Sequence, residues 1–312
     1  MHCSWLIQGN PHEAVRLTIN SIIAEQSTCR TLVRPLTENL DCDGATEPLL
    51  RIHLSEVPWE GVEVPRACLC SPEVLPHTIE STGSALLLNM TVSGMGPGDD
   101  YKNFNFNVEY EFIPKPECPG GNRRLEAPAG GVSIGSTDNP GECDTRPWLL
   151  EAPLGHSFLL TLPKATLANE SCSTDSRLVL RTPGSTDTLV VVCPTAAQDA
   201  VIQLVWPPIP GLQQQSTNRA AFLQDFVRGV PQLVAQWEPR RASALNMQWL
   251  HLRDPSKVAA LESETENTYS SKKKCRELCE ALGACIAKEL WCDGTPHCPD
   301  GKELHQLIKH IY

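Results

Sequence analysis

The densest group of residues with chemical potential lies near the end of the chain. Five cysteines fall within 24 residues, at positions 275, 279, 285, 292 and 298. A segment this short cannot bury a sufficient apolar core, so it needs disulfides or a metal to hold it together. The spacing does not suit zinc, because no second Cys-x-x-Cys or His-x-x-x-His follows at the distance of a tetrahedral site. The sequence therefore predicts a disulfide-held module from an oxidising compartment.

The cysteines of this segment and the residues beside them form a specific pattern. It contains Cys285-Ile, with six residues between Cys285 and the next cysteine, followed by Cys292-Asp-Gly and Cys298-Pro-Asp-Gly. This pattern resembles the LDL-receptor class A module. The family's pairing implies bridges from Cys275 to Cys285 and from Cys279 to Cys298, and it leaves Cys292 without its customary partner.

The same resemblance implies a calcium site. Class A modules hold the ion with oxygen ligands, mostly carboxylates from two acidic turns. Asp293 and Glu303 match carboxylate positions and are the calcium candidates. Leu290 and Thr295 stand at the positions of the backbone-carbonyl ligands.

The module departs from the family in ways that weaken it. His297 and Leu304 stand where two further carboxylates are usual, and Lys302 adds an adverse charge nearby. The sixth cysteine is absent, and the loss of a disulfide from so small a domain costs roughly 2–5 kcal/mol. We therefore expect weak calcium binding and a poorly ordered module.

Two other motifs resemble catalytic signatures. The Gly-x-Ser-x-Gly at 131–135 matches a nucleophile elbow, which requires a sharp turn between a buried strand and a helix. Its flanks, rich in Gly, Pro and Asn, predict neither element. His12-Glu13 lacks the second histidine of His-Glu-x-x-His, since position 16 is arginine. We expect no enzymatic activity, and we expect most other histidines to be exposed polar residues.

Length and composition set wider limits. At 312 residues the chain can hold two core-bearing domains and a small one, and its 14 cysteines suit an extracellular or cell-surface location. Sequons at Asn89 and Asn169 point the same way. A net charge of −11 argues against nucleic acid as a partner. The chain has no long apolar run and no signal peptide, so we interpret it as a piece of a secreted or membrane-anchored protein.

Alternation of apolar and polar residues predicts mostly β structure up to residue 112. It is strongest in Phe-Asn-Phe-Asn-Val-Glu-Tyr-Glu-Phe at 104–112, where five apolar residues should face a core. The other expected strands of this part are 15–19, 50–54 and 85–88.

This part resembles a CUB domain. Cys-Ser-Trp-Leu-Ile at 3–7 matches the family's Cys-x-Trp-x-Ile, and Phe106, Tyr110 and Phe112 match its closing strand. The family's first cysteine, which precedes this motif, is absent. The four inner cysteines are Cys29, Cys42, Cys68 and Cys70, and their pairing stays open.

Residues 118–240 repeat the plan. Cysteine spacings there resemble the two CUB disulfides in order, which implies Cys118–Cys143 and Cys172–Cys193. Trp148 stands later after its cysteine than the family pattern has it. This part therefore resembles a divergent second CUB domain.

Some CUB domains bind calcium at a loop edge. Asp175 matches one ligand position of that site, but Leu167 and Trp206 replace the others. In the first domain, Glu25 precedes Cys29 without the matching aspartate after it. We interpret these carboxylates as structural.

The predicted fold class is therefore mostly β: two CUB-type jelly-roll β-sandwiches plus a small disulfide-rich module similar to LDL-receptor class A. The predicted segments are a first CUB-like domain (1–114), a second (118–240), a linker (241–274), the module (275–304) and a tail (305–312).

The predicted function is protein–protein recognition by a non-enzymatic extracellular ectodomain. The module order resembles that of neuropilin-and-tolloid-like and related CUB–LDLa membrane proteins, which implies a protein ligand or co-receptor as partner. Two alternatives stay open: the accessory region of a secreted protease, and a fragment of an endocytic ligand receptor.

Overall fold

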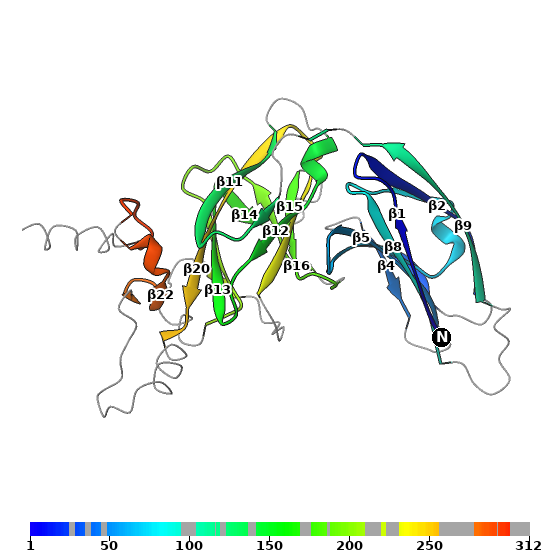
Figure 1. Cartoon of the computed structure of the whole chain (residues 1–312), viewed down its shortest axis with the longest axis horizontal. Helices are drawn as coiled ribbons and strands as arrows, with labels where there is room; N and C mark the ends of the chain where they lie inside the picture. Colours follow the sequence, from blue (N-terminus) through cyan, green and yellow to red (C-terminus); the bar gives the residue numbers. More distant parts are fainter. Residues whose placement is uncertain are drawn as a thin grey trace, which may run out of the picture.

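The computed structural model describes most of the chain as two β-sheet bodies and a small C-terminal module (Figure 1). The described residues are mostly strand, in agreement with the predicted class. No helix among them is long and apolar enough to cross a lipid bilayer. The described residues are 1–24, 29–34, 39–44, 49–94, 104–115, 117–118, 123–136, 142–168, 176–185, 188–209, 220–222, 231–255, 278–291 and 293–299.

The first body is a sandwich of a six-stranded and a three-stranded sheet. A short 3-10 helix, η1 (Pro72–Val74), precedes β7. In spatial order, the larger sheet contains β1 (His2–Gln8), β8 (Ala85–Ser93), β5 (Leu49–Trp59), β6 (Val62–Leu69), β4 (Leu40–Asp43) and β3 (Arg30–Val33). The smaller sheet contains β7 (His77–Glu80), β2 (Glu13–Ala24) and β9 (Phe104–Pro114).

Alternation builds the core of this sandwich. In β2, Val15, Leu17 and Ile19 are fully buried, because a period of two places them all on one face. Leu86 and Leu88 of β8 reach the same core from the opposite sheet. Each such burial contributes about 1.5–3 kcal/mol. The predicted strands of this part are confirmed.

The second body has a six-stranded and a seven-stranded sheet. A 3-10 helix, η3 (Glu142–Thr145), precedes β12. In spatial order, the six-stranded sheet contains β10 (Arg124–Leu125), β12 (Trp148–Glu151), β19 (Gln232–Glu238), β15 (Arg177–Arg181), β16 (Thr188–Pro194) and β14 (Ala165–Leu167). The other sheet contains β18 (Ala220–Phe222), β17 (Val201–Trp206), β13 (His156–Pro163), β20 (Ser243–Arg253), β22 (Ala284–Ile286) and β21 (Leu278–Cys279), with β11 (Ala129–Ser136) also paired to β20.

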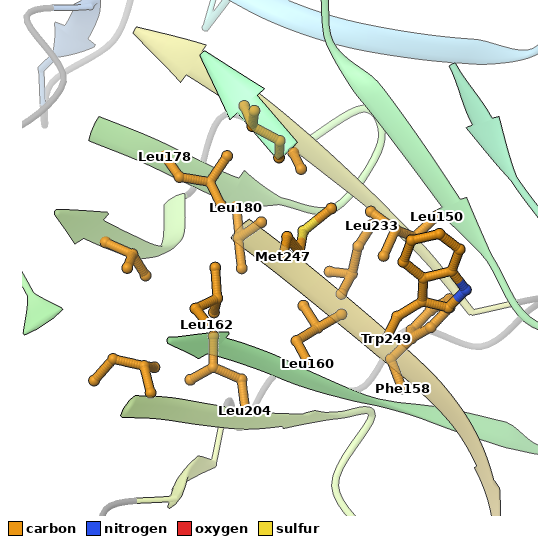
Figure 2. Packing of buried hydrophobic residues seen from close by; sticks show 14 of the residues in the cluster. Leu150, Phe158, Leu160, Leu162, Leu178, Leu180, Leu204, Leu233, Met247 and Trp249 are labelled. Carbon is orange, nitrogen blue, oxygen red and sulfur yellow. The ribbon is translucent and has the colours of Figure 1, made fainter. Parts of the chain in front are cut away.

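The core of the second sandwich is closed on both sides. Leu160 and Leu162 of β13 meet Leu178 and Leu180 of β15, with Met247 of β20 between them (Figure 2). All five have no exposed surface. Residues from the two sheets therefore interdigitate as in a well-packed interior.

The predicted linker at 241–274 is wrong over its first part. Residues 243–253 form β20, which pairs with β11 on one side and β13 on the other. Leu245, Met247 and Trp249 of this strand point into the core. In the sequence, Leu245, Met247 and Trp249 alternate with polar residues, as a strand with one buried face requires. Residues 256–277 and the predicted tail at 305–312 lie outside the described residues.

The C-terminal module is attached to the second sandwich. Its strand β22 extends the sandwich's sheet, with Leu252 of β20 opposite Ile286. Ile286, Leu290 of η6 (Lys288–Leu290) and Leu250 of β20 belong to one apolar cluster. The sequence predicts a poorly ordered module because one disulfide is missing and calcium binding is weakened. Contacts with β20 add an apolar core that so short a segment cannot form by itself, and Figure 1 shows β22 beside β20.

The two sandwiches meet at the hairpin of β5 and β6. Val62 and Val64 of β6 pack on Leu149 and Val234, which lie on the outer face of the second sandwich. All four are buried. An outer face that would otherwise expose apolar residues is thereby covered by the first sandwich.

Polar contacts reinforce this junction. The backbone N–H of Gly184 donates to the carbonyl of Glu63 at 2.8 Å. Nη1 of Arg181 donates to the carbonyl of Pro65 at 3.0 Å, and only 1% of Arg181 is exposed. Burial lowers the pKa of Arg181 to about 10. A guanidinium this deeply buried depends on its partners, so the junction is specific in geometry.

Candidate binding surfaces

One edge of the first sandwich leaves aromatic side chains of both sheets exposed. β1 ends the larger sheet and β9 ends the smaller one (Figure 1). Trp5 of β1 meets Phe106 of β9 edge to face, with ring centroids 5.7 Å apart. Tyr110 and Phe112 make a second such pair at 5.8 Å. We call Trp5, Phe106, Tyr110 and Phe112 the aromatic edge.

The predicted burial of β9 is correct only at its start. Phe104 is buried, but Trp5 is 45% exposed, Tyr110 57% and Phe112 43%. Tyr110 and Phe112 lie on the core-facing side of β9, opposite the buried Leu17 and Val15 of β2. Among the described residues, no strand continues the larger sheet beyond β1 to cover them. Periodicity reveals which face a residue takes, not whether the opposite layer reaches it, so the sequence carried no signal of this exposure.

The backbone and the charges of this edge are also distinctive. Among the described strands β9 pairs only with β2, so no described strand pairs with the N–H and C=O groups on its other side. On the polar face, Arg16 bonds Glu80 at 2.7 Å and Glu111 at 2.6 Å. These two bonds raise the pKa of Arg16. Glu109 has no ion-pair partner within the described part of the chain, so this edge carries negative charge.

The cysteines of the first sandwich form two bridges, Cys29–Cys70 and Cys42–Cys68. The sulfur atoms of Cys29, Cys42 and Cys70 lie within 4.8 Å of one another. Because all three are in disulfides, they offer no thiolate to a metal. Cys3 of β1 is half-buried and is the one free cysteine in the described part of the chain.

In the second sandwich, Cys118 and Cys143 are bridged, with their Cα atoms 5.5 Å apart. This is the pair that the CUB resemblance implies. Cys193 is also disulfide-bonded. Its implied partner, Cys172, lies outside the described residues.

In the module, Cys279 and Cys298 are bridged, with Cα atoms 5.7 Å apart. This is again the implied pair. Cys285 is disulfide-bonded, whereas its implied partner Cys275 and the odd Cys292 lie outside the described residues.

The calcium candidate Asp293 is already engaged by protein groups. Thr295 N donates to its Oδ1 at 2.8 Å, and Nε2 of His297 lies 2.9 Å from its Oδ2. The bond to His297, followed by that from Thr295, lowers the pKa of Asp293. Leu290 is packed in the apolar cluster, and Glu303 lies outside the described residues. Calcium requires several free oxygen ligands, so the described part of this donor set does not fit the ion.

The Gly-x-Ser-x-Gly segment lies within strand β11 rather than in a turn. Ser133 is exposed at mid-strand, opposite Asn246. Its neighbouring glycines have a packing reason. A Cβ at Gly130 would lie 2.4 Å from the Trp249 ring. Gly135 has a φ of +83°, and a Cβ there would lie 2.8 Å from the Trp237 ring. The glycines let two large indoles approach the backbone closely.

The remaining predicted residues have local roles or lie outside the described residues. Glu13 accepts bonds from the backbone and the side chain of Asn10 and holds the turn before β2. The sequon residue Asn89 lies in β8 and accepts a hydrogen bond from Ser4. Trp206 is a core residue with 1% exposed, and Leu167 is 40% exposed. The other sequon residue and two CUB-type carboxylates fall outside the described part, at Asn169, Asp175 and Glu25.

Comparisons with known proteins add little to this picture. A family model described as "Domain of unknown function (DUF7805)" matches residues 114–256, somewhat under half of the chain. The matched range ends after β20, in agreement with the assignment of that strand to the second sandwich. No curated protein matches the sequence.

Two solved structures are similar over 80% of the chain. One is the CUB1-EGF-CUB2 domain of human MASP-1/3, of which 93% is covered, with 8% identity and a TM-score of 0.23. The other is the mosquito-larvicidal Cry4Aa toxin from Bacillus thuringiensis, of which 58% is covered, with 7% identity and a TM-score of 0.20. Likeness at this level carries no argument about function.

Proposed function

We propose that this chain is a non-enzymatic extracellular recognition unit, built from two CUB-type sandwiches and an LDL-receptor class A-like module. Its aromatic edge binds an extended segment of a protein partner. The observation that carries the proposal is the exposure of Tyr110 and Phe112 on the core-facing side of an edge strand. Disulfides in both sandwiches and in the module support an oxidising location.

An extended segment suits this edge for two reasons. It can add a strand to β9, since the outer N–H and C=O groups of β9 are unpaired among the described strands. Its alternate side chains can then cover Trp5 and Phe112, which are large and partly dehydrated already. Exposed aromatic residues of this kind often dominate the binding energy of an interface.

The charge beside the aromatic edge indicates which residues a partner segment should contain. In a pairing of two β9 strands from two copies, the carboxylates of Glu109 and Glu111 would approach those of the second copy, and like charges across strands are destabilising. A segment with alternating apolar and basic residues meets both the aromatic row and these carboxylates. We therefore expect a basic–apolar strand as the ligand rather than a second copy.

The test uses the full chain and a synthetic 11-residue peptide, the length of β9, of alternating valine and lysine. A peptide of alternating valine and glutamate is the matched control. Calorimetry should show binding of the lysine peptide only, and the double change Tyr110→Ser and Phe112→Ser should weaken it about tenfold or more. Leu6→Ser, at an exposed apolar residue on the other face of β1, should leave binding unchanged.

Equal binding of the two peptides, or no loss in the Tyr110→Ser and Phe112→Ser variant, would overturn the proposal. Light scattering on the same samples detects self-association. A dimer abolished by these two changes would make the aromatic edge a homodimer interface instead.

A further inference from the structure

A cavity of about 270 Å³ lies where the two sandwiches join, and its charged lining residues are all cationic. Lys115 follows β9, Arg123 precedes β10, and Arg146 follows η3. No carboxylate lines the cavity in the described part of the chain. Three like charges around one space repel one another, so the cavity is arranged for an anion.

The three cations are held in place by covalent and polar contacts. The Cys118–Cys143 bridge joins the segment that carries Lys115 to the segment that carries Arg146. The guanidinium of Arg123 lies 4.7 Å above the centre of the Trp148 ring and donates to the carbonyl of Arg146. Such preorganisation reduces the entropy lost when a ligand binds.

The electrostatics of the cavity agree with this geometry. Burial, and then the charge of Arg146, lowers the pKa of Lys115. The same two causes lower the pKa of Arg123, and Asp144 offsets them in part. Lys115 and Arg123 are therefore partly desolvated beside a like charge, and an incoming anion offsets both effects.

A buried acid that bonds the lining residue Thr82 does not neutralise the cavity. Glu56 is fully buried. It accepts the hydroxyl of Thr82 at 2.6 Å and pairs with Arg66 at 3.3 Å. Its carboxylate is therefore already paired with Arg66 and hydrogen-bonded to Thr82, and it does not compensate the charge of the three cavity cations.

The other lining residues of the cavity suit a sugar ring. They include the half-buried indole of Trp59, the backbone of Gly83, the hydroxyl of Ser84, and the Thr82 hydroxyl, whose oxygen can still accept a hydrogen bond while it donates to Glu56. A flat aromatic face beside polar groups accepts a ring that is apolar on its faces and polar at its rim. We propose that this cavity binds a sulfated saccharide unit, with Lys115, Arg123 and Arg146 on the sulfate groups and Trp59 on the ring.

This cavity is separate from the aromatic edge, so the proposal stands or fails independently of the proposed function. The probe is a heparin-derived tetrasaccharide added to the full chain, with the fully desulfated tetrasaccharide as control. Binding should change the tryptophan fluorescence, because Trp59 and Trp148 border the site. Arg146→Gln and Lys115→Gln should each weaken binding about tenfold, the order expected for one charge-assisted hydrogen bond.

The control variant is Lys164→Gln, which makes the same change of charge at an exposed residue of the second sandwich. It should bind as the wild type does. A second readout guards against misfolding: without ligand, Lys115→Gln should unfold at a temperature equal to or above that of the wild type, because it relieves repulsion.

Three results would overturn the proposal. The first is equal binding of the sulfated and desulfated tetrasaccharides. The second is an equal loss of affinity in the Lys164→Gln and Arg146→Gln variants. The third is binding of a polyglutamate peptide in preference to the tetrasaccharide, which would assign the cavity to an acidic protein segment.

Discussion

The two sandwiches place their aromatic residues in opposite ways. In the second, Trp206 and Trp237 are each 1% exposed. In the first, Tyr110 and Phe112 are 57% and 43% exposed, although they also point to the core side of their strand. Aromatic rings on the core side of a strand are therefore part of the core in the second body, whereas Tyr110 and Phe112 of the first body stay exposed.

This difference arises because the sheets of the two sandwiches are covered to different extents. The second sandwich has sheets of six and seven strands, and both also carry apolar contacts on their outer faces. The first sandwich covers Leu149 and Val234 on one of these faces, and the module covers Leu250 and Leu252 on the other. The smaller sheet of the first sandwich has three strands. Coverage of both outer faces makes the second sandwich the structural centre of the described chain, and the more open first sandwich is the part that we propose for recognition.

The largest expected effect contrasts one aromatic residue from each body. Phe158→Ala removes a fully buried ring from the second core and should lower the free energy of unfolding by about 3–5 kcal/mol. Tyr110→Ala should lower it by less than about 1 kcal/mol, because the ring is already exposed. Urea unfolding followed by tryptophan fluorescence measures both. Similar losses in the two variants would show that the aromatic edge is covered in solution and would break the comparison.

The next effect concerns the module that covers the second sandwich. Replacing Cys279 and Cys298 together by serine removes their bridge and should destabilise the module by roughly 2–5 kcal/mol. Hydrogen exchange should then show loss of protection in β22, and also in the adjacent residues Leu252 and Arg253 of β20. Cys3→Ser, at a free cysteine, is the control and should change neither. Unchanged protection at Leu252 would mean that the module is not part of the second sandwich's core.

Much of the fold could be predicted from local pattern. Residues 15–19 of β2 and 50–54 of β5 alternate, and their buried residues Val15, Leu17, Ile19, Leu50, Ile52 and Leu54 follow directly from a period of two. The bridge from Cys118 to Cys143 matches what the family resemblance implied. These features depend on residues close in sequence or on a spacing that a family shares.

The rest depends on contacts that no local pattern encodes. Alternation marks β20 as a strand, but its place in the second sheet is set by pairing with β11, more than a hundred residues earlier. Lys115 and Arg146 both line the cationic cavity because the chain crosses the junction between the two sandwiches there. His251 looked like an exposed polar residue but is 2% exposed, because β20 is a central strand.

His251 predicts that the second sandwich loses stability in acid. Burial, and then His156, lowers its pKa to about 4 from an ordinary 6.5. A folded-state pKa below that of the unfolded chain means that protons bind the unfolded state first, so stability is full above pH 6.5 and falls as pH approaches 4. The loss should reach up to about 3 kcal/mol.

Unfolding of the wild type and of His251→Leu across this pH range measures the effect. The variant should have a flatter profile, and His12→Gln, at an exposed residue of the first sandwich, should keep the wild-type slope. If His251→Leu left the slope unchanged, the acid sensitivity would belong to other groups, and the greater burial of the second sandwich would have no titratable consequence.

The smallest expected effect separates a module held by packing from one held by an ion. Millimolar calcium should leave the unfolding midpoint of the full chain unchanged, because the oxygens of Asp293 already accept bonds from Thr295 and His297. His297→Asp supplies a carboxylate at that position, and the midpoint of this variant should then rise with calcium, since two acidic oxygens at one turn attract the ion. Magnesium, which is smaller and retains its water, is the control. A rise of the wild-type midpoint with calcium would show that residues beyond the described part complete a calcium site. The packing of Ile286 and Leu290 on β20 would then follow from ion binding and would not be the reason that the module is ordered.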